Sequence, residues 1–444
     1  MRLGQKHPAS ATCVAVMIVM TTLAAPAGAG PVTAVQVPEV PGNELDSAVL
    51  KIREGHSDQA LALIRELATK HPEWPPAAFI LSRLLFAANQ PVPARRALDQ
   101  AAGDAPGHPA AFIALAGLAL ADGRVSDAQL NLEHARVLTD AGKWNAEQTL
   151  GFRRDILSGL ASVAEARDDG KTAERHLREW LELEPRNAQA RYRLGGVQFR
   201  LGKPDEAFAS LQQAVKESTS LEPAAVAMAR LYSQKGDVKK AEEWFDYAIK
   251  LEPKNARTHL ARAAWLLDLG RVKIASSGVD EALKLDPSSK DAQRLRGLVA
   301  WHLRDLSSAE AILQPLLRDT PNDRVAADLL AVVLVEQEDP VKRARGLQLA
   351  ENTAKKNPQS HEAMAIFGWA HYRAGHLDQA DRLLRAAVQG VRTTPDVAYY
   401  LARVLADQGR ADDAMDLLKS ATKLPGAFAH RDDANALLES LKKS

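Results

Sequence analysis

Large apolar residues recur along the chain at a spacing that predicts many similar helices. In a repeating stretch of thirty-four residues, the twentieth, twenty-fourth and twenty-seventh positions share one helical face by their i, i+4, i+7 spacing. Residues 241–248 (AEEWFDYA) show the pattern, with Ala241, Phe245 and Ala248 on the apolar face. A period of this length indicates a stacked array of units rather than one globular core.

Prolines and small residues set the register of the array. Pro72 and Pro106 lie one period apart, as do Pro253, Pro287 and Pro321. This register gives eleven repeats, which begin at Pro41, Pro75, Pro109, Arg154, Ala188, Glu222, Ala256, Lys290, Arg324, His361 and Pro395. The eighth position is small in every repeat: Ala48, Ser82, Ala116, Ala161, Gly195, Ala229, Ala263, Gly297, Ala331, Gly368 and Ala402. Small residues at fixed positions allow two helices to pack closely.

Glycines predict a tight turn in the middle of most repeats. They are Gly55, Gly123, Gly202, Gly236, Gly270, Gly375 and Gly409. Glycine just past a helical stretch adopts the left-handed conformation at low cost and ends the helix there. Each repeat is therefore predicted to be a helix, a turn and a second helix, and the fold class is all-α.

The order of large, small and proline positions resembles the tetratricopeptide repeat. The resemblance covers residues 41–427, and only the ninth repeat departs at the twentieth position, where Gly346 replaces alanine. It implies a right-handed superhelical solenoid whose concave groove is lined by the first helix of each repeat. Members of this family mostly bind peptides or hold complexes together. Residues 428–444 follow the array and predict one amphipathic helix that caps its end.

The family's groove positions are the second, fifth, ninth and twelfth of each repeat. Carried over to this chain, they give the candidate partner-binding residues Val49, Ile52, Phe79, Arg83, Phe86, Tyr192, Phe199, Arg230, Arg294, Trp301, Trp369, Tyr372, Tyr399 and Arg403. Acidic residues share these positions: Asp155, Glu165, Asp291, Asp328, Glu362 and Asp396. Aromatic and arginine side chains are common binding anchors. The alternative is that many of these side chains only pack between neighbouring repeats.

The first twenty-nine residues have the features of a secretory signal peptide. Arg2 and Lys6 precede an apolar run at residues 13–23, and residues 27–29 (AGA) form a cleavage site. The run is shorter than the ~20 residues that span a bilayer. We expect cleavage after Ala29 and a periplasmic or secreted protein. The alternative is a membrane anchor formed by an uncleaved signal. Residues 30–40 are expected to be an extended linker.

Composition excludes several functional classes. Lys and Arg number 57 against 56 Asp and Glu, so no strong positive field is present to attract nucleic acid. Cys13 is the only cysteine and lies in the signal, so no disulfide or cysteine metal site is expected in the mature chain. The sequence has no HExxH, phosphate-binding glycine loop or GxSxG motif. We therefore expect no enzyme activity, no cofactor and no metal.

Eleven residues, 143–153, interrupt the spacing before the fourth repeat. They include Trp144 and Phe152. One interpretation is a lengthened helix that offers a contact ridge to a partner. The other, which we favour, is a helix extension whose aromatic side chains pack on the adjacent repeat.

The sequence as a whole predicts an exported, non-catalytic scaffold of the cell envelope. It is expected to bind a peptide or protein partner through the concave groove. The alternative is a structural assembly or secretion factor that uses its convex surface and its ends. The oligomeric state is not determined by any of these patterns.

Overall fold

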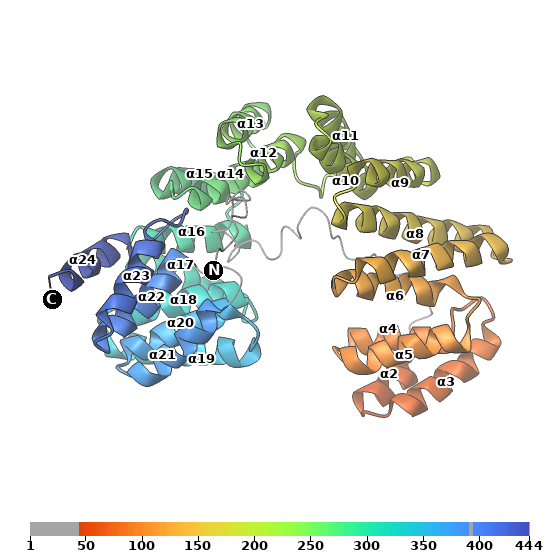
Figure 1. Cartoon of the computed structure of the whole chain (residues 1–444), viewed down its shortest axis with the longest axis horizontal. Coiled ribbons are helices and arrows are strands. Elements are labelled where there is room, and N and C mark those ends of the chain that lie inside the picture. Colours follow the sequence, from red (N-terminus) through yellow and green to blue (C-terminus); the bar gives the residue numbers. More distant parts are fainter. Residues whose placement is uncertain (1–43, 390–393, 444) are drawn as a thin grey trace, which may run out of the picture. The chain divides into compact units, whose positions relative to one another are not determined.

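Every regular element of the described chain is an α-helix. The computed structural model describes residues 44–389 and 394–443, and Figure 1 labels their helices α2 to α24. The chain divides into two compact parts on either side of residue 224. They are called here the N-terminal half (α2 to α11) and the C-terminal half (α12 to α24).

Helices of the N-terminal half follow the predicted repeats in pairs. They are α2 (Asp46–Arg53), α3 (Ser57–Lys70), α4 (Ala77–Ala87), α5 (Pro91–Asp104), α6 (Pro109–Ala121), α7 (Val125–Ala141), α8 (Ala146–Ala166), α9 (Gly170–Leu183), α10 (Ala188–Arg200) and α11 (Pro204–Glu217).

The C-terminal half continues the same pairing and adds one helix. Its helices are α12 (Ala224–Gln234), α13 (Val238–Leu251), α14 (Ala256–Asp268), α15 (Val272–Leu285), α16 (Lys290–His302), α17 (Leu306–Asp319), α18 (Arg324–Glu336), α19 (Pro340–Lys356), α20 (His361–Arg373), α21 (Leu377–Val388), α22 (Pro395–Asp407), α23 (Ala411–Ala421) and α24 (Arg431–Leu441). The sequence predicted that the last helix starts at Phe428. Helix α24 begins three residues later, at Arg431.

In three repeats whose eighth residue is glycine, that residue packs against the large twenty-fourth residue. At Gly195 on α10, a Cβ atom would lie 2.7 Å from Leu211 Cγ and 3.0 Å from the carbonyl oxygen of Ala207 on α11. Gly297 faces Leu313 in the same way at 2.7 Å. The small residue is thus required because the facing side chain occupies the space that a larger one would need.

The predicted turns have the backbone conformation that favours glycine. All seven glycines have φ between 72° and 85°. The equivalent position is Asn89, Asp168 and Arg304 in three other repeats, where φ is 57°, 58° and 61°. Asparagine and aspartate tolerate this region, but arginine rarely adopts it. Arg304 therefore marks a strained turn between α16 and α17.

The eleven additional residues lengthen α8 at its start. Asn145 caps the helix through the backbone N–H of Gln148, at 2.8 Å, and the Gln148 side chain accepts from the backbone of Asn145. Trp144 and Phe152 form an edge-on cluster with His108, with ring centroids 4.9 and 5.6 Å from that of His108. The interpretation that these aromatic rings pack on the adjacent repeat is confirmed.

The predicted signal (residues 1–29) and linker (residues 30–40) lie outside the described residues. The first described helix, α2, begins at Asp46, five residues after the predicted start of the first repeat at Pro41. Across the described ranges, no helix has both the length and the apolar character to cross a membrane.

Two adjacent glycines on α10 provide a matched test of the packing register. Gly195→Ala is expected to lower the free energy of unfolding by about 1–3 kcal/mol, because the new methyl group overlaps Leu211 and Ala207. Gly196 has only Arg200 Nη1 within 4 Å, at 3.9 Å, so Gly196→Ala is expected to be neutral or to stabilise by up to about 1 kcal/mol. Chemical unfolding measures both. Equal effects would show that the register is wrong.

Candidate functional site

The first helices of the C-terminal half form one continuous surface. Helix α14 contacts α16, α16 contacts α18, α18 contacts α20, and α20 contacts α22. We call this surface the first-helix face. It is the surface on which several of the predicted groove residues lie, namely Arg294, Trp301, Trp369, Tyr372, Tyr399 and Arg403.

A non-helical stretch of the chain itself occupies the first-helix face. Residues 426–430, called here the terminal segment, form the second part of the link from α23 to α24, and all five are buried. The backbone N–H of Ala427 donates to the carbonyl of Leu267 on α14, at 3.1 Å. The segment therefore leaves the last repeat and reaches back to the seventh. Connecting segments usually run over the surface, so this burial distinguishes it.

Asp396 anchors the terminal segment through its backbone. Asp396, at the start of α22, accepts hydrogen bonds from the backbone N–H groups of His430, at 3.1 Å, and Ala429, at 3.3 Å. Its Oδ1 also lies 2.7 Å from His430 Nδ1. These contacts satisfy polar groups that would otherwise be buried without a partner.

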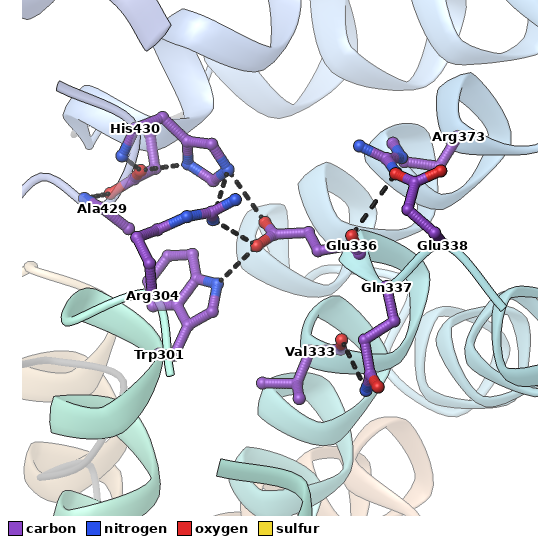
Figure 2. Close-up of polar contacts among 10 residues, drawn as sticks. Trp301, Arg304, Val333, Glu336, Gln337, Glu338, Arg373, Ala429 and His430 are labelled. Atoms are coloured by element: carbon purple, nitrogen blue, oxygen red, sulfur yellow. Dashed lines mark hydrogen bonds and ion pairs between the residues drawn. The ribbon is translucent and has the colours of Figure 1, made fainter. Parts of the chain in front are cut away.

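Two carboxylates hold the His430 ring from opposite sides. Nδ1 contacts Asp396, and Nε2 lies 3.0 Å from Glu336 Oε1 at the end of α18. The other oxygen of Glu336 accepts from Arg304 Nη1 at 2.5 Å and from Trp301 Nε1 at 3.1 Å. Figure 2 shows His430, Arg304 and Trp301 converging on Glu336. The Glu336 and His430 side chains are 1% and 2% exposed, so the ion pair is shielded from solvent.

Aromatic rings enclose the imidazole. The Tyr399 ring stacks on His430 with a centroid distance of 4.9 Å and an interplanar angle of 15°. Tyr400, Trp301 and Trp369 present their rings at 5.3, 6.0 and 5.9 Å. These rings exclude water, which strengthens the attraction between the imidazole and the carboxylates.

The two carboxylates make His430 a cation at neutral pH. Burial alone would lower its pKa, but the hydrogen bonds and the negative charges of Asp396 and Glu336 raise the pKa of His430 to about 9. Burial acts against the charge of Glu336 as well, yet its contacts with His430 and Arg304 lower the pKa of Glu336. Among the described residues, no group of three or more His, Cys, Asp and Glu is arranged to hold a metal ion.

Six predicted groove residues are buried, which corrects the expectation that they line an open groove. They are Ile52, Phe79, Phe199, Trp301, Trp369 and Tyr399. Ile52 and Phe79 are each 1% exposed, because a first helix packs against its partner and against neighbouring repeats at once. Of these six, Trp301, Trp369 and Tyr399 surround His430, so they are buried by the terminal segment as well as by the repeats.

The remaining candidates keep some exposure. Phe86 is 36% exposed, and seven are half-buried: Val49, Arg83, Tyr192, Arg230, Arg294, Tyr372 and Arg403. Tyr372 and Arg403 form a chain in which Arg403 Nε donates to Tyr372 Oη at 2.8 Å and that hydroxyl donates to Asp407 at 2.7 Å. Arg294 pairs with Asp291 and, at 3.0 Å, with Asp323. Intramolecular contacts thus already engage several cations of the predicted set.

The N-terminal half has a smaller charged site among its first helices. Asp155 on α8 is 1% exposed and accepts from Arg154 Nε at 2.9 Å. Burial raises the pKa of Asp155 and lowers that of Arg83 on α4, and each attracts the other. Arg83 Nη1 and Asp155 Oδ2 are buried without a hydrogen-bond partner in the described part of the chain.

Sequence reasoning missed four residues of the C-terminal site: Arg304, Glu336, Tyr400 and His430. Glu336 and Tyr400 lie one residue beyond groove positions, and His430 lies outside the repeats. Arg304 carried a usable signal, because it occupies the turn position that holds glycine in seven repeats. A long cationic residue at a position suited to glycine indicates that contacts of its side chain hold the strained backbone in place.

Models of the tetratricopeptide repeat match the chain in several places. One matches residues 199–265, and another matches residues 159–222, 260–324 and 367–428. The chain belongs to the tetratricopeptide repeat family. Proteins of this family are generally non-catalytic scaffolds for protein interactions, and the all-α repeat fold described above suggests a scaffold for protein interactions. No curated protein sequence matches this tetratricopeptide repeat protein significantly.

Solved structures resemble the chain only distantly. The thermophilic tetratricopeptide repeat protein TTC0263 of Thermus thermophilus is 21% identical, covers 43% of this chain and 100% of its own, and has a TM-score of 0.36. Yeast Tom70 is 16% identical over 90% of this chain and 94% of its own, with a TM-score of 0.35. Pseudomonas aeruginosa pilF is 18% identical over 48% of this chain and 96% of its own, with a TM-score of 0.34.

Proposed function

We propose that this protein is an exported, non-catalytic scaffold that binds a peptide or protein partner through the surface of its first helices. One observation carries the proposal. In the C-terminal half this surface holds a non-helical segment, with Asp396 bonded to the segment's backbone and an aromatic cage around its His430 side chain. A surface that binds one non-helical segment through backbone and side chain has the properties that peptide recognition needs.

The export part of the proposal rests on the amino-terminal sequence. Arg2 and Lys6, the apolar run at residues 13–23 and the AGA site at residues 27–29 support a cleaved signal and a periplasmic or secreted protein. We expect the natively produced protein to begin at Gly30. Intact-mass spectrometry measures this directly. A chain that retains Met1 or Arg2 would instead indicate an anchor or a cytoplasmic protein.

Partner capture from the cell-envelope fraction tests the binding part. Phe86 on α4 is a large apolar side chain that is 36% exposed at a groove position. We expect Phe86→Ala to reduce capture of the partner while leaving the unfolding transition in place, because exposed aromatic residues often anchor partners. Phe79→Ala on the same helix should instead destabilise the fold by about 3–5 kcal/mol, since Phe79 is 1% exposed.

Exposed apolar residues on a second helix provide the matched control. Leu130 and Val137 on α7 are 65% and 61% exposed. Their replacement by alanine should leave capture unchanged if the first helices bind the partner. Loss of capture on changing Leu130 and Val137, with no effect of Phe86→Ala, would favour the alternative of an assembly factor that uses its convex surface.

A further inference from the structure

Few apolar side chains attach the terminal segment and α24. Phe428 is the one large apolar residue of the segment and is 8% exposed, and in α24 only Ala434 and Leu437 are buried. The polar attachments are the contacts of His430 and Ala429 with Asp396, of the His430 ring with Glu336 and Arg304, and the backbone bond of Ala427. An attachment of this kind depends on a few exchangeable groups.

The cage is not fully satisfied by the segment it holds. Trp369 Nε1 is buried and has no acceptor within the described part of the chain. An unpaired buried donor destabilises the state in which it is buried. Arg304 reaches Glu336 from a strained backbone with φ of 61°. The first-helix face is thus less than fully complementary to its own segment.

We propose that residues 426–430 are a displaceable occupant, and that the first-helix face binds a partner's non-helical segment in which a histidine directly follows a small residue. The inference rests on the proposed function and names the kind of partner that the C-terminal half takes. In the free protein the terminal segment occupies the partner's place.

The geometry selects histidine at the caged position. Its two ring nitrogens point to opposite sides, which lets Nδ1 contact Asp396 at 2.7 Å while Nε2 contacts Glu336 at 3.0 Å. The flat ring also stacks on Tyr399. Lysine presents a single point charge at the end of a flexible chain and cannot do both.

The geometry also selects small residues at three of the four positions before the histidine, the exception being the buried Phe428. A Cβ on Gly270 would lie 2.8 Å from the carbonyl oxygen of Gly426, so the two backbones approach too closely for side chains between them. Ala427 and Ala429 are 5% and 9% exposed, which leaves little room for longer side chains. A partner that also supplies an acceptor to Trp369 Nε1 would bind better than the terminal segment does.

Hydrogen exchange on the intact protein tests displacement first. The amides of Ala427, Ala429 and His430 are expected to exchange through local opening, at a lower free energy than the amides of Leu401 and Ala402 inside α22. If both groups exchange only together, the terminal segment is a fixed part of the core and the proposal is wrong.

Peptide binding tests the specificity. The probe is a fluorescent peptide of residues 422–436 (TKLPGAFAHRDDANA), measured by anisotropy against the full chain and its His430→Gln variant. Because a tethered segment competes at high effective concentration, we expect the variant to bind the probe roughly tenfold or more tightly than the unaltered chain does. The same peptide carrying His430→Gln is expected to bind the His430→Gln protein roughly tenfold more weakly than the unaltered peptide does. Adding Asp396→Asn to the His430→Gln protein is expected to weaken binding of the unaltered peptide by a similar factor.

Each contrary result has one meaning. Equal binding by both proteins would show that the segment does not compete, and equal binding of both peptides would show that the cage does not select histidine. No binding by any pair would show that this surface is not a docking site. Partner capture that depends on Phe86 would still support the proposed function in each case, because Phe86 lies in the N-terminal half.

Discussion

Asp396→Ala is expected to destabilise the C-terminal half by about 3–5 kcal/mol, the usual cost of removing one partner from a buried ion pair. Asp396 is 5% exposed and accepts from the backbone of Ala429 and His430 and from the His430 ring. Its removal leaves the imidazole Nδ1 and two backbone N–H groups buried without their acceptor, and the charged ring keeps only the Glu336 carboxylate beside it. Because the terminal segment must then leave the cage to be solvated, α24 should detach as well.

Glu362→Ala is the matched control for this prediction. Glu362 holds the same position of the tenth repeat that Asp396 holds in the eleventh, yet its side chain is exposed and accepts from Ser360 Oγ at 3.0 Å. Its loss should change the free energy of unfolding by less than about 1 kcal/mol. Chemical unfolding measures both variants. Similar small effects would mean that the contacts of Asp396 add little to stability.

Raising the pH from about 6.5 to about 9 is expected to weaken docking of the terminal segment by roughly 3 kcal/mol, the equivalent of the pKa difference at 1.36 kcal/mol per unit. The pKa of His430 is about 9 when docked against an ordinary 6.5, so the docked state binds the additional proton. The stabilisation is therefore complete below about pH 6.5 and is lost as the pH rises through about 9.

Several groups of the cage have a shifted pKa. Of these, only His430 changes charge between about pH 6.5 and about pH 9. Burial lowers the pKa of His302 to about 4, and burial raises the pKa of both Tyr399 and Tyr400 above the ordinary tyrosine value. The pKa of Arg304 is raised by Glu336 against the effect of burial. The charged groups that face His430 are Arg304, Glu336 and Asp396.

Hydrogen exchange of the terminal segment at several pH values measures this dependence, after correction for the intrinsic exchange rate. His430→Gln is the control, because glutamine keeps hydrogen-bonding capacity but does not titrate. We expect the dependence in the unaltered protein and its absence in the variant. A dependence that persists in His430→Gln would assign it to another group.

Candidate binding residues were predicted less well than the repeats. The position rule found Trp301, Trp369, Tyr399 and Asp396, which the structure brings together at one ring. The same rule could not show that Ile52 or Phe79 is buried, since one helical position can face the partner helix, the next repeat or solvent. Which it faces depends on how neighbouring repeats pack.

The sequence by itself determined the helical hairpins, their register and their turns. These features depend on contacts within one repeat, such as Gly195 with Leu211, and a periodic pattern records them many times over. Only the tertiary structure decided that the terminal segment folds back onto the first-helix face. His430 and Arg304 are 126 positions apart and the contact occurs once, so no period in the sequence carries it. Its formation depends on carboxylates and aromatic rings from several repeats, which come together only after the repeats have stacked.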